Sequence, residues 1–440
     1  MRLNSAISVV LGATAVAAGA VQKRALTAVT VKGNAFFAGD DRFYIRGVDY
    51  QPGGSSKLAD PIADEDGCKR DIVEFKKLGI NAIRVYTVDN TASHDTCMNA
   101  LADAGIYLIL DVNTPFYSLN RANPEPSYNA VYLQNIFATI DAFAGYTNTL
   151  AFFSGNEVIN AANNSDLAPY VKAVTRDMRN YISARNYRAI PVGYSAADVS
   201  ENRLEMAEYM NCGSDDVRSD FFAFNDYSWC NPSSFTQSGW DQKVKNFTGY
   251  GIPLFLSEYG CNTNTRTFEE VASLYSTEMT AVYSGGLVYE YSQESNKYGL
   301  VSINGDTVTE LDDFTALKDE FSKTDNPSGN GGYNSTGGAS GCPAASANWD
   351  VTTLDLPTFP EGAKQYLTNG AGTGPGLDGK GSQNAGSSST TTSTSSSSSS
   401  TASATSSGAA GRIELGELSF VPLAFVGMLS IFTLFGASLL

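Results

Sequence analysis

The chain has 440 residues, with 46 acidic and 29 basic side chains, one histidine and a formal net charge of −17. Nucleic-acid binding requires clustered Lys and Arg, so a balance this acidic argues against a nucleic-acid partner. The single histidine, His94, argues against a histidine-based metal site and against a Ser-His-Asp or Cys-His catalytic group. We therefore expect any catalysis to rest on carboxylates, tyrosines and amides, with no metal and no cofactor.

The amino terminus has the pattern of a secretory signal peptide. In residues 1–20, one Arg precedes an apolar run that ends in Ala18-Gly19-Ala20, the small-x-small pattern of a cleavage site. The pair Lys23-Arg24 follows. It is either a second, dibasic processing site or an exposed basic pair, and the sequence leaves both open.

The region expected to fold spans residues 25–345, a length that suits one barrel-sized domain. Eight short β-rich runs recur along this region. The eight runs are 43–51, 82–88, 107–112, 150–157, 188–198, 221–229, 252–260 and 286–294. Helical periodicity lies between them, for example over 67–79 and 167–186.

Eight buried strands alternating with helices predict an α/β fold, the (β/α)8 TIM barrel. The alternative is an open doubly wound sheet. That fold would place a Gly-rich phosphate loop after the first strand, and residues 49–54, DYQPGG, do not match G-x-G-x-x-G.

Six cysteines in a secreted chain predict three disulfides, and the residues alone leave their pairing open. They are Cys68, Cys97, Cys212, Cys230, Cys261 and Cys342. The sequons at Asn163, Asn246 and Asn334 are candidate N-glycosylation sites.

The carboxyl-terminal part has the composition of a tail rather than of a core. We expect a Gly-rich linker over 346–386 and a disordered, O-glycosylated stalk over 387–407, which is nearly pure Ser and Thr. Small residues, a polar spacer and a final apolar run from Phe420 to Leu440 then make a GPI-anchor signal over 408–440, removed on maturation. Attachment is expected at Ser407 or Gly408. A tail-anchor helix is the alternative, and the signal peptide disfavours it.

Two glutamates lie at the ends of predicted strands, where a barrel carries its chemistry. Glu157 ends the fourth strand and Glu258 ends the seventh. They are 101 residues apart, or about 34 residues for each of three β/α units, so both should face one mouth. Two carboxylates in one cleft are what glycoside cleavage needs. Close together, one should keep its proton, and we expect Glu157 to be the acid and Glu258 to be ionised.

Four segments carry a resemblance to a known family: FFSGNE (152–157), NDYSWC (225–230), LSEYG (256–260) and GLVYEYSQE (286–294). They resemble the fungal β-1,3-glucanosyltransferases of glycoside hydrolase family 72, over about residues 25–345. Only one cysteine follows Cys261, so the chain looks like the branch without the Cys-rich carbohydrate-binding module. The resemblance implies a retaining enzyme that cleaves β-1,3-glucan internally. It then joins the new reducing end of the donor to the non-reducing end of an acceptor glucan.

The resemblance also implies individual roles. Glu157 would be the general acid and base, Glu258 the nucleophile, Asn156 a ligand of the sugar 2-hydroxyl and Tyr227 a donor to Glu258. Donor-groove residues would be Gln51, Tyr86, Asp111, Tyr289 and Glu290, and acceptor-side residues would be Asp198 and Arg203. The disulfides implied are Cys68–Cys97, Cys230–Cys261 and Cys212–Cys342.

Two other functions remain open at this point. A hydrolytic β-1,3-glucanase on the same barrel would not lengthen its substrate, and a non-catalytic glucan-binding wall protein would not need the carboxylate pair. We expect a monomer whose partners are glucan chains and, through the GPI lipid, the outer face of the plasma membrane.

Overall fold

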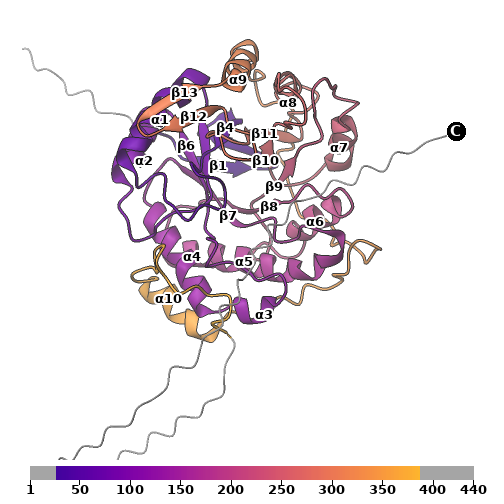
Figure 1. Cartoon of the computed structure of the whole chain (residues 1–440). Helices are drawn as coiled ribbons and strands as arrows, with labels where there is room; N and C mark the ends of the chain where they lie inside the picture. Colours follow the sequence, from indigo (N-terminus) through magenta and orange to yellow (C-terminus); the bar gives the residue numbers. More distant parts are fainter. Residues whose placement is uncertain (1–25, 387–440) are drawn as a thin grey trace, which may run out of the picture. The chain divides into compact units, whose positions relative to one another are not determined.

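The computed structural model describes residues 26–386, and eight parallel strands form a closed barrel at its centre (Figure 1). Each strand of the barrel overlaps one of the predicted runs, so the expected (β/α)8 barrel is confirmed. In chain order they are β4 (Ile45–Asp49), β5 (Ala82–Val85), β6 (Tyr107–Asp111), β7 (Thr149–Asn156), β8 (Val192–Ala196), β9 (Phe221–Asp226), β10 (Leu254–Tyr259) and β11 (Tyr283–Val288). The last strand, β11, begins before the run predicted at 286–294 and ends at Val288. Pairing of β11 with β4 closes the ring.

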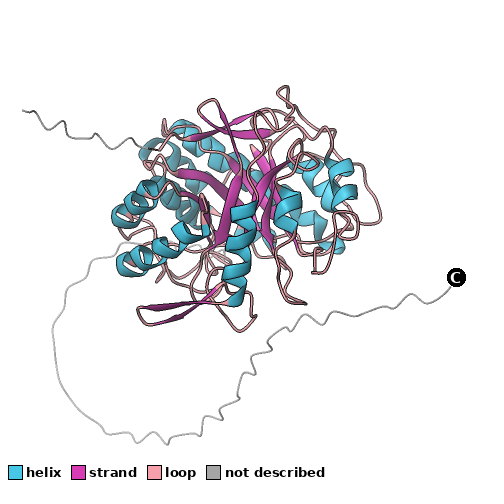
Figure 2. Cartoon of the chain, turned by 90° about the horizontal axis from the view of Figure 1, so that it is seen from above, coloured by secondary structure: helices cyan, strands magenta, loops and turns pink. Residues whose placement is uncertain are grey.

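Helices surround the strands, as the view from above shows (Figure 2). They are α1 (Glu65–Leu78), α2 (Asp95–Asp103), α3 (Pro124–Ser127), α4 (Ala130–Phe143), α5 (Ala168–Ala184), α6 (Arg203–Met210), α7 (Trp240–Phe247), α8 (Glu270–Leu274) and α9 (Asp312–Lys323). The first helix illustrates why they form where they do. The Asp64 side chain accepts the Gly67 N–H at its start, and Gly79 ends it in the left-handed conformation.

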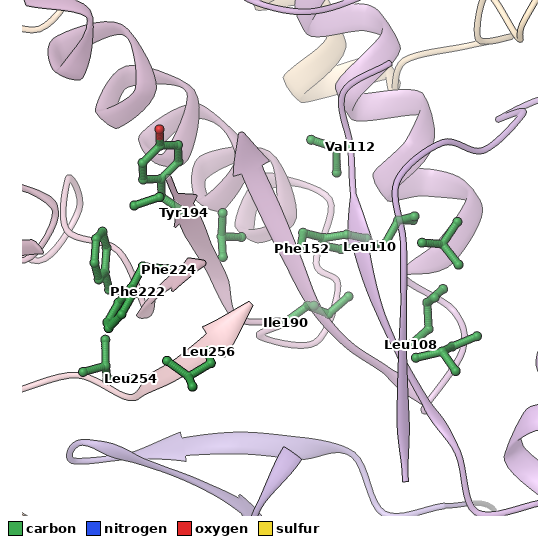
Figure 3. Close-up of a cluster of buried hydrophobic side chains, with 14 of the residues drawn as sticks. Leu108, Leu110, Val112, Phe152, Ile190, Tyr194, Phe222, Phe224, Leu254 and Leu256 are labelled. Carbon is green, nitrogen blue, oxygen red and sulfur yellow. The ribbon is translucent and has the colours of Figure 1, made fainter. Parts of the chain in front are cut away.

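The strands are apolar on both faces, and alternate residues enter two different cores. Leu108, Leu110 and Phe152 point outward into the large core beneath the helices (Figure 3). Ile109 and Phe153, their neighbours along the chain, belong to a second core inside the barrel. Because both faces of each strand are buried, the strands appear in the sequence as unbroken apolar runs.

A small antiparallel sheet, not predicted from the sequence, closes the amino-terminal end of the barrel. It consists of β1 (Val29–Lys32), β2 (Ala35–Ala38) and β3 (Asp41–Phe43). Phe36 is fully buried, and its ring centroid lies 6.0 Å from that of Phe221 and 5.9 Å from that of Phe255. This end of the barrel is thus sealed by aromatic packing.

The three disulfides join Cys68 to Cys97, Cys212 to Cys342 and Cys230 to Cys261. This is the pairing that the resemblance implies.

A hairpin of β12 (Val301–Asn304) and β13 (Thr307–Glu310) precedes α9.

Residues 346–386, expected to be a linker, instead pack on the barrel domain. Trp349 is fully buried, with its ring 5.5 Å from that of Tyr209. A 3-10 turn, Glu361–Ala363, and α10 (Lys364–Asn369) follow, and Figure 1 shows them beside α4. Aromatic and apolar residues scattered among the glycines supply the buried surface. The packed domain therefore extends past the expected boundary at 345 to at least 386.

The expected signal peptide, stalk and GPI signal lie outside the described residues. Among residues 26–386, no helix is long and apolar enough to cross a membrane.

Candidate active site

Both predicted carboxylates lie at the carboxyl-terminal ends of their strands. Glu258 is part of β10, whereas Glu157 directly follows β7 and has a φ of 49°, a left-handed conformation that is uncommon for a non-glycine residue. Asn225 on β9 stands opposite Glu258 in the strand register, and its amide Nδ2 donates to Glu157 Oε1 at 2.7 Å. One amide thus links the two strand ends, and the carboxylates share one mouth.

Glu258 is 7 % exposed and accepts three hydrogen bonds. Tyr86 Oη donates to Oε1 at 2.8 Å, Tyr227 Oη donates to Oε2 at 2.7 Å, and Arg84 Nη1 lies 3.3 Å from Oε1. Both carboxylate oxygens are therefore fixed in place. The Tyr227 contact is the one that the resemblance implies, and Tyr86 makes a second contact of the same kind.

Burial raises the pKa of Glu258 to about 7, even though Arg84 and the two tyrosine hydroxyls favour its ionised form. The charge of Glu157 acts in the same direction as burial. This differs from the expectation that Glu258 is the readily ionised member of the pair. Sequence reasoning weighed the neighbouring charge and the tyrosine, but it could not measure how deeply the side chain is buried.

Arg84 is a central residue of the site that the sequence analysis missed. It is fully buried on β5, and its Nε and Nη2 donate to Asp111 at 2.8 and 3.2 Å. Its Nη1 also lies 3.9 Å from Asp49 Oδ1, and burial raises the pKa of Asp49 well above the ordinary value. A buried guanidinium needs carboxylate partners. The charged residue within the apolar run 82–88 was the signal that could have revealed it.

A buried chain of hydroxyl and amide groups connects Asn156 to Glu157 around the inside of the mouth. Ser195 Oγ lies 2.7 Å from Asn156 Oδ1 and 2.8 Å from Ser257 Oγ. Ser257 Oγ in turn donates to Asn225 Oδ1 at 2.9 Å. Ser195, Ser257 and Asn225 are each fully buried. The chain fixes the Asn156 amide and the Glu157 carboxylate relative to each other.

A cleft of about 450 Å³ lies beside the carboxylates. Its walls come from the loops after β4, β5, β6 and β7. Among the residues that line it are Ser55, Tyr86, Asp111, Asn113, Ser118, Leu119, Arg121 and Asn156. Three of the predicted binding residues therefore line one cleft: Tyr86, Asp111 and Asn156. The Tyr289 hydroxyl lies 3.3 Å from Ser55 Oγ at the edge of this cleft, and the Tyr227 ring lies 6.4 Å from the Tyr289 ring.

Gln51 and Glu290, predicted to line the donor groove, are both buried and bonded within the protein. The Gln51 amide nitrogen donates to the carbonyls of Lys57 and Ala59, and its oxygen accepts from the backbone N–H groups of Tyr86 and Thr87. The structure therefore places Gln51 beneath the cleft as a support for two loops. Glu290 accepts from Asn296 at 2.7 Å, and burial raises its pKa to about 7.

Asp198 and Arg203, predicted to reach the acceptor side, form an ion pair with each other. The second oxygen of Asp198 accepts the Tyr227 N–H at 3.0 Å. Arg203 is 8 % exposed, with its guanidinium 4.8 Å from the centre of the Phe224 ring. The pair thus holds the backbone at Tyr227 and adjoins the site through it.

Within residues 26–386, no three His, Cys, Asp or Glu side chains are grouped so that they could hold a metal ion. Of the three sequons, Asn163 and Asn246 are exposed, and Asn334 is half-buried.

Comparison with known proteins decides the family. The profile of glycoside hydrolase family 72, described as glucanosyltransferase, matches residues 18–325. The chain belongs to the glucanosyltransferase family. The 1,3-beta-glucanosyltransferase gel1 of Aspergillus fumigatus is 73 % identical over 368 residues, which cover 83 % of this chain and 81 % of that protein.

A yeast relative and a solved structure agree with this assignment. The 1,3-beta-glucanosyltransferase GAS5 of Saccharomyces cerevisiae is 55 % identical over 370 residues, covering 83 % of this chain and 76 % of that protein. Saccharomyces cerevisiae Gas2p in complex with laminaripentaose is 40 % identical, with a TM-score of 0.72, covering 77 % of this chain and 78 % of that one.

Proposed function

We propose that this protein is a retaining β-1,3-glucanosyltransferase that elongates cell-wall glucan. The observation that carries the proposal is the pair Glu157 and Glu258 at one barrel mouth, joined by Asn225, in a chain that belongs to the glucanosyltransferase family. The named activity of its relatives and the laminaripentaose bound to Gas2p point to β-1,3-glucan as donor and acceptor.

In the first step, a Glu258 oxygen attacks the anomeric carbon of a glucose unit within the donor chain. The bond to the leaving O3 breaks, and Glu157 gives that oxygen its proton, so the reducing-side fragment departs as an alcohol. A retaining mechanism of this kind places the two carboxyl groups about 5–5.5 Å apart. Asn156 binds the 2-hydroxyl of the same glucose, a contact that strengthens as positive charge develops on the ring.

In the second step, the non-reducing end of an acceptor glucan replaces the departed fragment. Glu157, now ionised, removes the proton from the acceptor 3-hydroxyl, and that oxygen displaces Glu258 from the anomeric carbon. Water competes for the same intermediate. Transfer prevails when the cleft holds and orients the acceptor, which gives its hydroxyl a high effective concentration.

The groups around Glu258 prepare it for attack. Its raised pKa makes it more basic than an ordinary carboxylate, while Arg84, Tyr86 and Tyr227 keep its ionised form accessible. The rings of Tyr227 and Tyr289 are platforms for sugar stacking at the edge of the cleft. Asp198 and Arg203 support the acceptor side through the Tyr227 backbone.

We further infer a secreted monomer, N-glycosylated at Asn163, Asn246 and Asn334, and held at the outer face of the plasma membrane and in the wall by a GPI anchor at Ser407 or Gly408. The signal peptide, the Ser/Thr-rich tract and the apolar carboxyl terminus support this location. Release of the intact protein from membranes by a phosphatidylinositol-specific phospholipase is the expected result, and retention of the apolar tail peptide in the mature protein would exclude it.

The activity is tested by incubating the protein with a reduced laminari-oligosaccharide and sizing the products. Transfer predicts products longer than the substrate, together with the complementary shorter fragment. Only shorter products would make the protein a hydrolytic glucanase, and an unchanged substrate would leave glucan binding without catalysis.

A further inference from the structure

Two segments far apart in the sequence lie against each other next to the candidate active site. The C-terminal strap, residues 371–386, lies against the β6–α3 loop, residues 112–123, through its last part, residues 379–386. Within this contact, the Ser382 N–H donates to the Phe116 carbonyl at 3.0 Å, and Gln383 Nε2 donates to Ser118 Oγ at 2.9 Å. Just beyond the loop, in α3, the Pro126 carbonyl accepts the Gly386 N–H at 3.0 Å.

The β6–α3 loop is a wall of the cleft beside the carboxylates. Thr114, Pro115, Ser118, Leu119 and Arg121 all line the cleft. The same loop also reaches the general acid, because the Arg121 guanidinium donates to the backbone carbonyls of Glu157 and Val158. A continuous set of contacts therefore leads from the strap through this loop to Glu157.

Close approach explains why the strap is rich in glycine. A Cβ at Gly379 would lie 1.9 Å from the hydroxyl oxygen of Tyr117, and one at Gly381 would lie 3.0 Å from the Phe116 carbonyl oxygen. Tyr117 is 2 % exposed, so its ring has little room to move away. At Gly379 and Gly381, glycine therefore lets the strap lie close to the Tyr117 side chain and to the Phe116 backbone.

We propose that the C-terminal strap belongs to the substrate-binding apparatus and fixes the β6–α3 loop as the glucan-binding wall on the Asn156 side of the cleft. Gly379, Ser382 and Gln383 are positioning residues, acting on the sugar through the loop. Without the strap, the loop would keep its own turn between Thr114 and Tyr117 and the Arg121 contacts, but it would lose the contacts at Phe116 and Ser118. It would then sample more conformations, and the cost of ordering it would weaken binding. The proposal rests on the proposed function for the identity of the ligand.

The test uses the full chain with two substitutions, Gly379→Ala and Gln383→Ala. Gly145→Ala is the control for the first, because a Cβ at Gly145 meets nothing within 4 Å. Gln365→Ala is the control for the second, because its amide bonds only within the turn at α10. We expect the two strap variants to raise KM for laminari-oligosaccharide donors about three- to tenfold, with kcat within about twofold of wild type and the melting temperature retained. Both controls should match wild type.

Hydrogen exchange separates this proposal from the proposed function, because it needs no substrate. Faster amide exchange in residues 112–123 of Gly379→Ala, absent in Gly145→Ala, is expected whether or not glucan is the substrate. Unchanged exchange in this loop, or an unchanged KM in both strap variants, would overturn the proposal. An inactive wild-type protein with faster exchange in the variant would overturn the proposed function alone.

Discussion

At the amino-terminal ends of the barrel strands, Phe36 packs against Phe221 and Phe255, whereas at the carboxyl-terminal ends the same ring of strands presents Glu157 and Glu258. The first end buries aromatic surface, with Phe36, Phe221 and Phe255 in one apolar core. The second buries Arg84, Asp111 and Glu258 together, at a cost in desolvation. The difference teaches that the stabilising apolar packing is concentrated at one end of the barrel. The other end can therefore hold charged groups in an apolar environment, where their pKa values are shifted.

The largest effect should come from the carboxylates themselves. Glu157→Gln should lower the rate of chain transfer about 10²–10⁴-fold, because Gln cannot exchange a proton with the glycosidic oxygen. Glu258→Gln should lose at least as much, since Gln does not act as the nucleophile. Initial rates of product elongation measure both, with circular dichroism as the control for folding. Turnover at the wild-type rate by either folded variant would contradict the assignment.

The opposite result is expected at the sealed end. Phe36→Ala should lower the free energy of unfolding by about 3–5 kcal/mol, because it leaves a cavity among fully buried rings. Activity per folded molecule should remain, since the Phe36 ring packs on Phe221 and Phe255, at the end of the barrel opposite the carboxylates. Denaturant unfolding and rate measurements below the transition test both parts. Val31→Ala, at a half-buried position of the same sheet, is the control with a smaller expected loss.

That comparison between the two ends fails if Phe36→Ala is as stable as wild type. It also fails if the variant is folded but inactive, because the ends would then be coupled.

Tyr227→Phe should move the acidic limb of the pH profile of kcat/KM. The Tyr227 hydroxyl stabilises the ionised form of Glu258 and so lowers its pKa, against the larger effect of burial. Removing it should raise that pKa further, and the limb should move to higher pH by about one unit. The rate should then fall most at low pH and recover as the pH rises. Tyr298→Phe, whose ring packs on Tyr227, is the control.

A limb that stays in place or moves to lower pH would show that Tyr227 does not govern the charge of Glu258. The wild-type limb itself is informative. Ordinary carboxylates would place the optimum at about pH 4–6, whereas the pKa of about 7 for Glu258 places the acidic limb nearer neutrality.

The smallest effect should follow Ser257→Ala. This change removes the hydroxyl between Ser195 and Asn225 and leaves the Asn225 amide less firmly oriented toward Glu157. We expect kcat to fall a few-fold with KM unchanged, and stability to change by about 1 kcal/mol. Ser154→Ala, another buried serine, is the control because it bonds outside this chain of groups. A lowered kcat in both variants, or in neither, would contradict a positioning role.

The sequence predicts the barrel and its two carboxylates well because both follow local rules. Each barrel strand is a short apolar run, and strand ends carry the chemistry of this fold. The sequence predicts the rest of the site less well, because Ser195 and Ser257 are small residues inside apolar runs, with no local signal of their role. Arg84 is a charged residue within a buried strand, which is a visible signal. Its partners Asp111 and Glu258 are distant in the sequence, so the signal does not identify them.

The sequence analysis also missed structure near each end of the folded domain, in each case for a physical reason. The strands around Phe36 are only three or four residues long, so their periodicity is too short to read. Residues 346–386 were interpreted as a linker from their glycine content. At Gly379, however, glycine is required by close contact with Tyr117, and composition alone does not distinguish flexibility from close packing.

The central claim is that Glu258 forms the covalent intermediate and Glu157 serves as its acid and base. The most direct measurement is the anomeric configuration of the products that Glu157→Ala and Glu258→Ala form with azide and a nitrophenyl β-laminari-oligosaccharide, whose leaving group needs no acid. Glu157→Ala still forms the intermediate, so azide entering in place of the missing carboxylate should give the β-azide. Glu258→Ala forms no intermediate, and azide in the vacated space should give the α-azide. An α-azide from Glu157→Ala, or a β-azide from Glu258→Ala, would contradict the assignment of the two roles.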